Sequence, residues 1–177
     1  MAGLKFRVLL DSQDKTEIFR DILIADSDNL ESFYRAIIDA YQFSHEQMAS
    51  FYVSNNQWDK GHEIALFDMS FGDDDQTIPD VMSTTTVEEF IEVKDQKFIL
   101  VHDFMRMWIF LIELIGYEEA TPERPRVTLS VGNAPAEASK TSDELLFETE
   151  SDFDEEDEDE DEFGFNEFDD SYDQYDY

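Results

Sequence analysis

The sequence predicts an α+β fold, a small mixed β-sheet resembling a β-grasp with one long and one short helix packed on it, followed by a disordered acidic tail. Three observations carry this prediction. Several stretches alternate apolar and polar residues with the period of strands, and residues 27–43 carry the spacing of a helix. Residues 141–177 contain no basic side chain. The length of 177 residues suits one domain with an appendage.

The first elements are strands over residues 4–10 and 17–24, because both are rich in branched and aromatic residues. The polar segment between them predicts a hairpin turn. A helix follows, whose apolar side chains recur at spacings of three and four residues: Leu30, Phe33, Ile37, Ile38 and Tyr41. Its start is predicted at Ser27, Asp28 or Asn29, whose side chains accept hydrogen bonds from the free backbone N–H groups there.

Five more strands are predicted by alternation or by apolar runs, over residues 48–54, 62–67, 97–104, 107–117 and 125–132. A short helix of about two turns is predicted within residues 83–93, after a run of threonines that can cap it. We expect the long helix to pack on strands that contain Phe6, Val8, Ile99 or Val101.

Charge and composition together divide the chain into three parts. Residues 1–140 carry 26 acidic and all 12 basic side chains, a net charge of −14, whereas residues 141–177 carry 19 acidic side chains and none that is basic. We therefore predict an α+β domain over residues 1–132 and an acidic, aromatic-containing tail over 146–177. The small, polar residues of 133–145 are typical of a linker.

Composition excludes several classes of function. Cysteine is absent, which excludes disulfides and thiol chemistry. The N-terminus lacks a signal-peptide core, and the most apolar stretch contains Glu113 and is too short for a membrane span. A soluble, cytoplasmic bacterial protein with no membrane contact is expected. A net charge of −33 repels phosphate, so direct binding to nucleic acid is not expected.

The three histidines predict no metal or catalytic site. None of His45, His62 and His102 has a second ligand at a metal-binding spacing, so we interpret them as surface or hydrogen-bonded structural side chains. His102 and Asp103 are neighbours in a strand and point to opposite faces, so they cannot share a substrate. Asp103 is predicted to anchor a turn. No cofactor is implied.

The order of elements and several motifs resemble the plasmid pRiA4b ORF-3-like family, described as mobile-element passenger proteins, over about residues 4–137. The aromatic-Ser-His segment is "FSHEQMASFYV" (43–53), and the Pro-containing ending is "PRVTLSVGNAPAE" (125–137). The late aromatic strand carries the family positions Asp103, Phe104 and Trp108. The family's Gly-Asp turn is replaced by Met105 and Arg106. The resemblance implies a fold but no specific reaction, and the acidic tail is expected to lie outside the family pattern.

The tail contains eight aromatic rings among its carboxylates, whereas disordered spacers are poor in aromatics. Carboxylates keep the segment open and attract basic surfaces, while the rings fill apolar notches or stack on arginine. Spaced anions with flat rings imitate a single-stranded nucleic acid. The predicted partner-binding residues are Phe153, Asp154, Glu155, Glu156, Asp157, Phe163, Phe165, Phe168, Tyr172 and Tyr175.

The sequence thus predicts a non-catalytic interaction protein that docks through its folded domain and occupies a basic nucleic-acid-binding surface with its tail. RNA polymerase, a ribosomal protein or a mobile-element nucleic-acid-binding protein would offer such a surface. The plan is similar to that of the delta subunit of bacterial RNA polymerase, a small folded body with an acidic tail. The alternative is an enzyme or small-ligand-binding module of the family whose tail only solubilises it.

Overall fold

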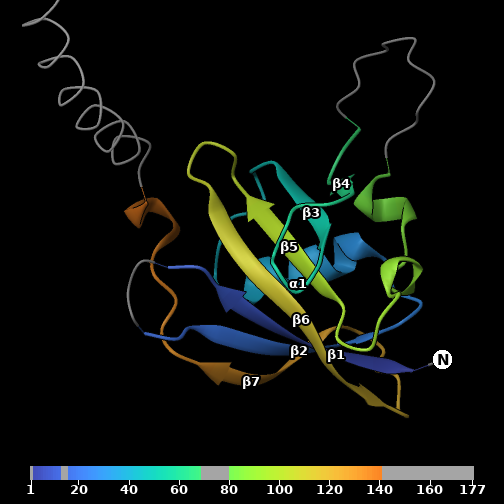
Figure 1. The fold of residues 1–177 in the computed structure, drawn as a ribbon. Helices are drawn as coiled ribbons and strands as arrows, with labels where there is room; N and C mark the ends of the chain where they lie inside the picture. Colours follow the sequence, from blue (N-terminus) through green and yellow to red (C-terminus); the bar gives the residue numbers. More distant parts are fainter. Residues whose placement is uncertain (1, 13–15, 69–79, 141–177) are drawn as a thin grey trace, which may run out of the picture. The chain divides into compact units, whose positions relative to one another are not determined.

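The computed structural model describes residues 2–12, 16–68 and 80–140. Within these residues all seven predicted strands are present (Figure 1), and the fourth is shortened to three residues. The strands are β1 (Gly3–Leu10), β2 (Phe19–Ala25), β3 (Ala49–Ser54), β4 (Glu63–Ala65), β5 (Lys97–His102), β6 (Trp108–Glu118) and β7 (Arg126–Val131). The helices are α1 (Leu30–Ala40) and three 3₁₀ turns, η1 (Met82–Thr84), η2 (Val87–Phe90) and η3 (Glu137–Ser139).

The strands form one sheet in the order β4-β3-β5-β6-β1-β2-β7. All six pairings between these strands are antiparallel. The mixed character that we expected is therefore limited to an isolated parallel bridge between Ala65 and Val81. Antiparallel pairing follows from the short connections of β1–β2, β3–β4 and β5–β6, since parallel neighbours need long crossovers. The likeness to a β-grasp remains a prediction.

Helix α1 covers one face of the sheet with the predicted side chains. The side chain of Asn29 caps its start by accepting a hydrogen bond from the N–H of Ser32 at 2.8 Å. All five residues of the predicted apolar face are buried. The ring of Phe33 lies 4.8 Å from that of Phe6 on β1 and 5.7 Å from that of Phe51 on β3. The amphipathic pattern therefore identified the face that forms the core.

Strand β5 is buried on both faces, and only one of these faces belongs to the core beneath the helix. Phe98 and Leu100 belong to the core cluster beneath α1, whereas Ile99 and Val101 are buried on the opposite face. The helix therefore packs on strands that contain the expected residues, with Phe6 and Val8 facing it and Ile99 and Val101 pointing away from it. Because all six residues of β5 are buried, the strand carries no alternation that would distinguish its faces.

The predicted short helix is a single 3₁₀ turn, η2. Thr86 and Glu89 form a capping box at its start, so the predicted threonine cap is confirmed. The turn does not extend, because the backbone at Ile91 is extended, with φ of −86° and ψ of 97°. At its start, the N–H of Val87 donates to the carbonyl of Asp28 at 2.9 Å, which ties the turn to the segment before α1.

The folded unit runs to Ser139. Residues 133–139, within the predicted linker, contact the domain: Ala134 packs against the core and Glu137 forms several hydrogen bonds. The predicted disorder of the tail lies outside the described residues. No helix within the described ranges is both long and apolar enough to cross a membrane.

Candidate functional site

Three stretches that are distant in the sequence meet at one end of the sheet. They are residues 43–45 after α1, residues 102–108 at the turn from β5 to β6, and residues 134–139 after β7. The same three stretches carry the resemblance to a known family. We call this cluster the anchor site, because it holds the segment from which the chain continues into its acidic part.

Asp103 anchors the turn between β5 and β6, as predicted. It is buried, and its backbone is in the left-handed region with φ of 64°. Its Oδ1 accepts hydrogen bonds from the N–H groups of Met105 at 3.1 Å and Arg106 at 3.3 Å. The guanidinium of Arg106 lies 3.7 Å from Oδ2. These hydrogen bonds and this ion pair hold the turn in its conformation.

The other two motif residues of this turn have different surroundings. Trp108 is buried, its ring lies 4.8 Å from that of Phe43, and its Nε1–H donates to the carbonyl of Glu137 at 3.2 Å. Phe104 is 38% exposed, and the next residue, Met105, is 71% exposed. The turn therefore presents two apolar side chains to solvent beside a buried tryptophan.

His102 is the centre of a buried hydrogen-bond network. Its Nε2 lies 2.7 Å from Oε2 of Glu137, and its Nδ1 lies 3.1 Å from the hydroxyl of Tyr34 on α1. Oε1 of Glu137 also accepts the N–H of Ser44 at 2.9 Å. The ring of Phe43 stacks on the imidazole with centroids 5.8 Å apart. Helix, sheet and C-terminal segment are thereby joined through one side chain.

The pKa shifts define the protonation of this network. Burial lowers the pKa of His102 below its ordinary value of 6.5, and the hydrogen bond with Glu137 offsets part of this effect. Burial acts to raise the pKa of Glu137, but the N–H of Ser44 and the His102 ring outweigh it and lower the pKa. Burial, then the charge of Glu137, raises the pKa of Tyr34 to about 12. At neutral pH the neutral imidazole donates through Nε2 to ionised Glu137 and accepts the Tyr34 hydroxyl at Nδ1.

This arrangement resembles an acid–base relay but faces inward. His102 is fully buried, and both of its ring nitrogens are engaged. The network therefore presents no base or nucleophile to a substrate; it fixes the position of η3. This agrees with the interpretation of His102 as a hydrogen-bonded structural side chain. The other histidines lie at the surface, His45 bonded to Asp39 and His62 to Asp80, both at 2.6 Å.

Replacing Glu137 with glutamine should lower the free energy of unfolding at pH 7 by about 1–3 kcal/mol, the typical cost of weakening a buried hydrogen bond that involves a charge. A carboxylate whose folded pKa is lowered stabilises the fold above its ordinary pKa of 4.5 and loses this effect as pH falls. The difference from wild type should therefore narrow below pH 4.5. Thermal melts across the acid range measure it.

His102 makes a second contribution to the loss of stability of the fold as pH falls. Because its folded pKa is lowered, the unfolded chain binds protons below pH 6.5 that the folded chain excludes, so stability also falls from that pH downward. The exposed Glu123 provides the matched control, and Glu123→Gln should leave the melting curves unchanged. A stability difference for Glu137→Gln that stays constant with pH would contradict a role for its charge.

A shallow depression at the other end of β7 is a less defined feature. Leu23 and residues 120–126 line it, and Leu23 is its only buried lining residue. Arg124 and Arg126 stand at its rim, and neither forms an ion pair with any described residue. No buried polar group points to a ligand there. Within the described ranges, no group of three His, Cys, Asp or Glu side chains is placed to hold a metal ion.

The structure places the family-motif residues but not the tail. Asp103, Phe104 and Trp108 lie together at the anchor site, while all ten predicted partner-binding residues of the tail lie outside the described residues. Sequence reasoning missed Tyr34, Ser44 and Glu137. No local signal identifies Glu137, because its partner His102 is 35 positions away.

Comparison with known proteins agrees with the fold and the motifs. The fold is similar to the crystal structure of the protein of unknown function MM3350 from Methanosarcina mazei Go1, with a TM-score of 0.65 and 15% sequence identity over 84% of this chain and 81% of that chain. No curated protein matches the sequence. The family model described as "Plasmid pRiA4b ORF-3-like protein" matches residues 2–176. The match extends past residue 137 and includes the acidic segment, which we expected to lie outside the family pattern. The chain therefore belongs to the plasmid pRiA4b ORF-3-like protein family.

Proposed function

We propose that this chain is a non-catalytic interaction protein that docks on a partner through its folded domain and places residues 146–177 in a basic, nucleic-acid-binding surface. One observation carries the proposal. Residues 141–177 hold 19 acidic side chains, no basic one and eight aromatic rings. Solubility alone requires the charges but gives no reason for the rings.

The two kinds of side chain have separate physical roles. Carboxylates attract a basic surface over distance and release bound counterions on contact, which sets the rate and the salt dependence of binding. Aromatic rings stack on arginine planes or fill sites made for bases, which slows dissociation. A segment that combines both competes for surfaces built to bind single-stranded DNA or RNA.

The anchor site supports this proposal because it defines where the acidic segment begins. Glu137 and Trp108 bind η3 to the end of the sheet, only a few residues before the acidic run starts. Once the domain has docked, a tethered segment binds at a high effective concentration, set by the length of its tether. A tether point held by hydrogen bonds to the sheet keeps that length short and constant.

The exposed turn of the anchor site supplies a surface through which the folded domain contacts the partner. Phe104 and Met105 project from a backbone that Asp103 fixes, so little conformational freedom is lost when they bind. Aromatic and methionine side chains are enriched at protein interfaces. We assign the domain's own contact with the partner to this pair.

The partner is a cytoplasmic protein with a basic cleft, such as RNA polymerase, a ribosomal protein or a mobile-element nucleic-acid-binding protein. The test is affinity capture from a bacterial lysate with the full chain and with a chain that ends at Lys140, after circular dichroism shows that both are folded. The proposal predicts a basic partner that the full chain captures and the shortened chain loses. Equal capture by both chains would contradict a role for the tail and favour a family enzyme or ligand-binding module.

A further inference from the structure

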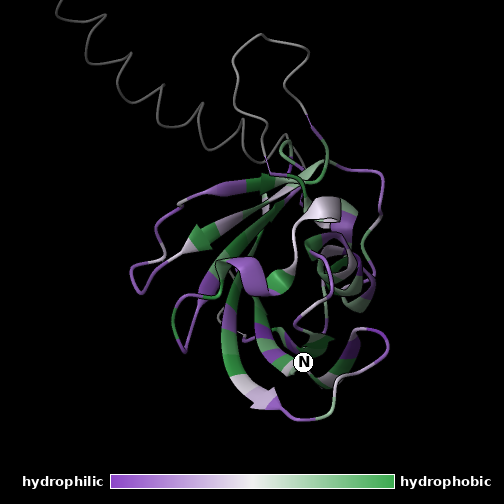
Figure 2. Cartoon of the chain, turned by 90° about the vertical axis from the view of Figure 1, so that its right-hand side faces the viewer, coloured by the Kyte–Doolittle hydropathy of each residue, from purple (hydrophilic) through white to green (hydrophobic). Residues whose placement is uncertain are grey.

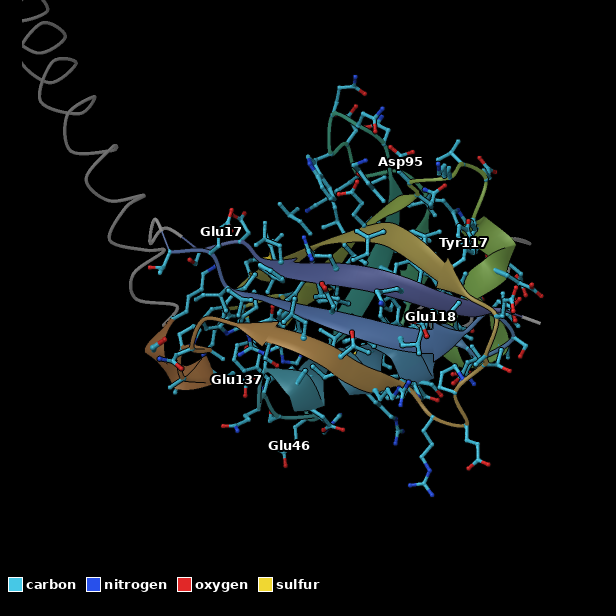
Figure 3. All side chains as sticks on the ribbon, turned by 90° about the horizontal axis from the view of Figure 1, so that it is seen from below. Glu17, Glu46, Asp95, Tyr117, Glu118 and Glu137 are labelled. Carbon is cyan, nitrogen blue, oxygen red and sulfur yellow. The ribbon has the colours of Figure 1, made fainter. Side chains whose placement is uncertain are left out.

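One face of the sheet lacks a covering helix among the described residues. Helix α1 packs on the side of Phe6 and Val8, whereas the alternate residues of the same strands, such as Leu9 and Arg7, point to the opposite side. We call this side the outer face. In the view from below, β6, β1, β2 and β7 are in front and no helix crosses them (Figure 3). The strands of the sheet carry both hydrophobic and hydrophilic residues (Figure 2).

The strand register aligns apolar residues into a row across the outer face. Each member is directly opposite the next on the neighbouring strand, from β3 to β7: Tyr52, Ile99, Leu111, Leu9, Phe19 and Val131. Ile99 is buried and the other five are partly exposed. Six adjacent strands thus contribute one apolar residue each, and the centre of the row lies between Leu111 on β6 and Leu9 on β1.

A second row, two residues along each strand, carries charges of alternating sign. Its members are Lys97, Glu113, Arg7 and Asp21, on β5, β6, β1 and β2. Arg7 binds both carboxylate oxygens of Asp21 at 2.9 Å, and Nζ of Lys97 lies 3.6 Å from Glu113. We call this second row the charge ladder. Its centre also lies between β6 and β1. Its four charges cancel, in a chain whose net charge is −33.

Both rows are self-complementary under the same symmetry operation. A two-fold axis parallel to the strands, between β6 and β1, places Leu111 opposite Leu9 of a second copy and Ile99 opposite Phe19. The same axis places the partly exposed Glu113 opposite the partly exposed Arg7, so these two charges meet their opposites. It also aligns Lys97 with Asp21, but both are buried in their own chain and contribute through the field beneath the face. An axis perpendicular to the strands would place each charge opposite itself. Isologous dimers require this kind of self-complementary surface.

We propose that the outer face binds a second copy of this chain, with the two sheets packed face to face about a two-fold axis between β6 and β1. Packed sheets of this kind lie about 10 Å apart with their strands nearly aligned. The charge balance of the face favours a second copy over a basic partner, which would be drawn to the acidic surfaces instead. This association is independent of the tail's partner.

Sedimentation of the full chain across a dilution series tests the proposal. Wild type should shift toward twice the mass of the chain as its concentration rises. Added salt should strengthen this shift, because it screens the repulsion between two acidic chains. Leu111→Glu, at the centre of the apolar row, should raise the dissociation constant on the order of tenfold or more.

Val127→Glu is the matched control, because it makes the same change of charge on β7. Val127 pairs with core-facing Ile22 and is 42% exposed, so it lies on the other face of the sheet. This variant should associate like wild type. Wild type that stays monomeric at every concentration and salt, or equal effects of the two variants, would overturn the proposal.

Glu113→Arg separates the effect of the charge ladder on self-association from the effect of the chain's net charge. The change makes the chain less acidic, which by itself would strengthen association. The ladder predicts the reverse, because the introduced guanidinium would lie opposite Arg7 of the second copy. Glu123→Arg, in an exposed loop, makes the same change outside the ladder and should strengthen association slightly. Stronger association for both variants would contradict the two-fold arrangement, once circular dichroism confirms that both are folded.

Discussion

Changing Phe153, Phe163, Phe165 and Phe168 to serine should weaken binding of the full chain to its basic partner by about three orders of magnitude, since each stacked ring contributes roughly 1 kcal/mol or more. The charge of the tail is unchanged, so the slope of affinity against salt should be retained. Titration of the captured partner with both chains at several salt concentrations measures both quantities.

A charge variant is the matched control for this result. Asp154, Glu155, Glu156 and Asp157, changed to their amides, keep every ring but remove four charges. This variant should show a shallower salt slope, because fewer counterions are released on binding. If the serine variant bound as tightly as wild type, the rings would have no part in binding, and the tail would act through charge alone.

Phe33→Ala should lower the free energy of unfolding by about 3–5 kcal/mol, because truncating a fully buried aromatic side chain leaves a cavity. Phe33 is completely buried between Phe6 and Phe51, where helix α1 meets β1 and β3. Such a loss is a large part of the stability of a small domain. Denaturant unfolding followed by circular dichroism measures it.

Arg35 provides the control on the opposite face of the same helix. It is exposed, and its ion pair with Glu31 at 3.3 Å is of the weak i,i+4 type. Arg35→Ala should change the free energy of unfolding by no more than about 0.5 kcal/mol. Similar losses for the two variants would mean that Phe33 does not hold the helix to the sheet.

The elements of the fold could be predicted because their signals are local. Alternation or short apolar runs identified the strands, and the spacing from Leu30 to Tyr41 identified both the helix and its buried face. The faces of β5 could not be predicted, since a strand buried on both sides has no alternation. The length of η2 could not be predicted either, because no glycine or proline marks its end at Ile91.

The candidate site was predicted only in part, for a similar reason. Asp103 was recognised as a turn residue from its local context, and the structure confirms this role. The bond between His102 and Glu137 joins the end of β5 to the segment after β7, although these two strands are not neighbours in the sheet, and no local pattern encodes such a contact. The rows of the outer face likewise exist only in the register of six strands.

The tail and the outer face predict opposite responses to salt. Tail binding weakens as salt rises, because it depends on attraction between unlike charges, whereas self-association strengthens, because it occurs between acidic chains. The two can therefore be measured in one preparation. The two proposals can also be refuted independently. A chain that is always monomeric would still bind its partner through the tail, and a chain without the tail would still have an intact outer face.

Competition with nucleic acid tests the central claim most directly. The full chain, bound to its captured partner, is titrated with single-stranded DNA and RNA at constant salt. If the tail occupies a nucleic-acid-binding surface, the nucleic acid displaces it in proportion to its own affinity for the partner, and the partner's nucleic-acid binding falls when the chain is added. Retention of the chain while the partner is saturated with nucleic acid would contradict the claim.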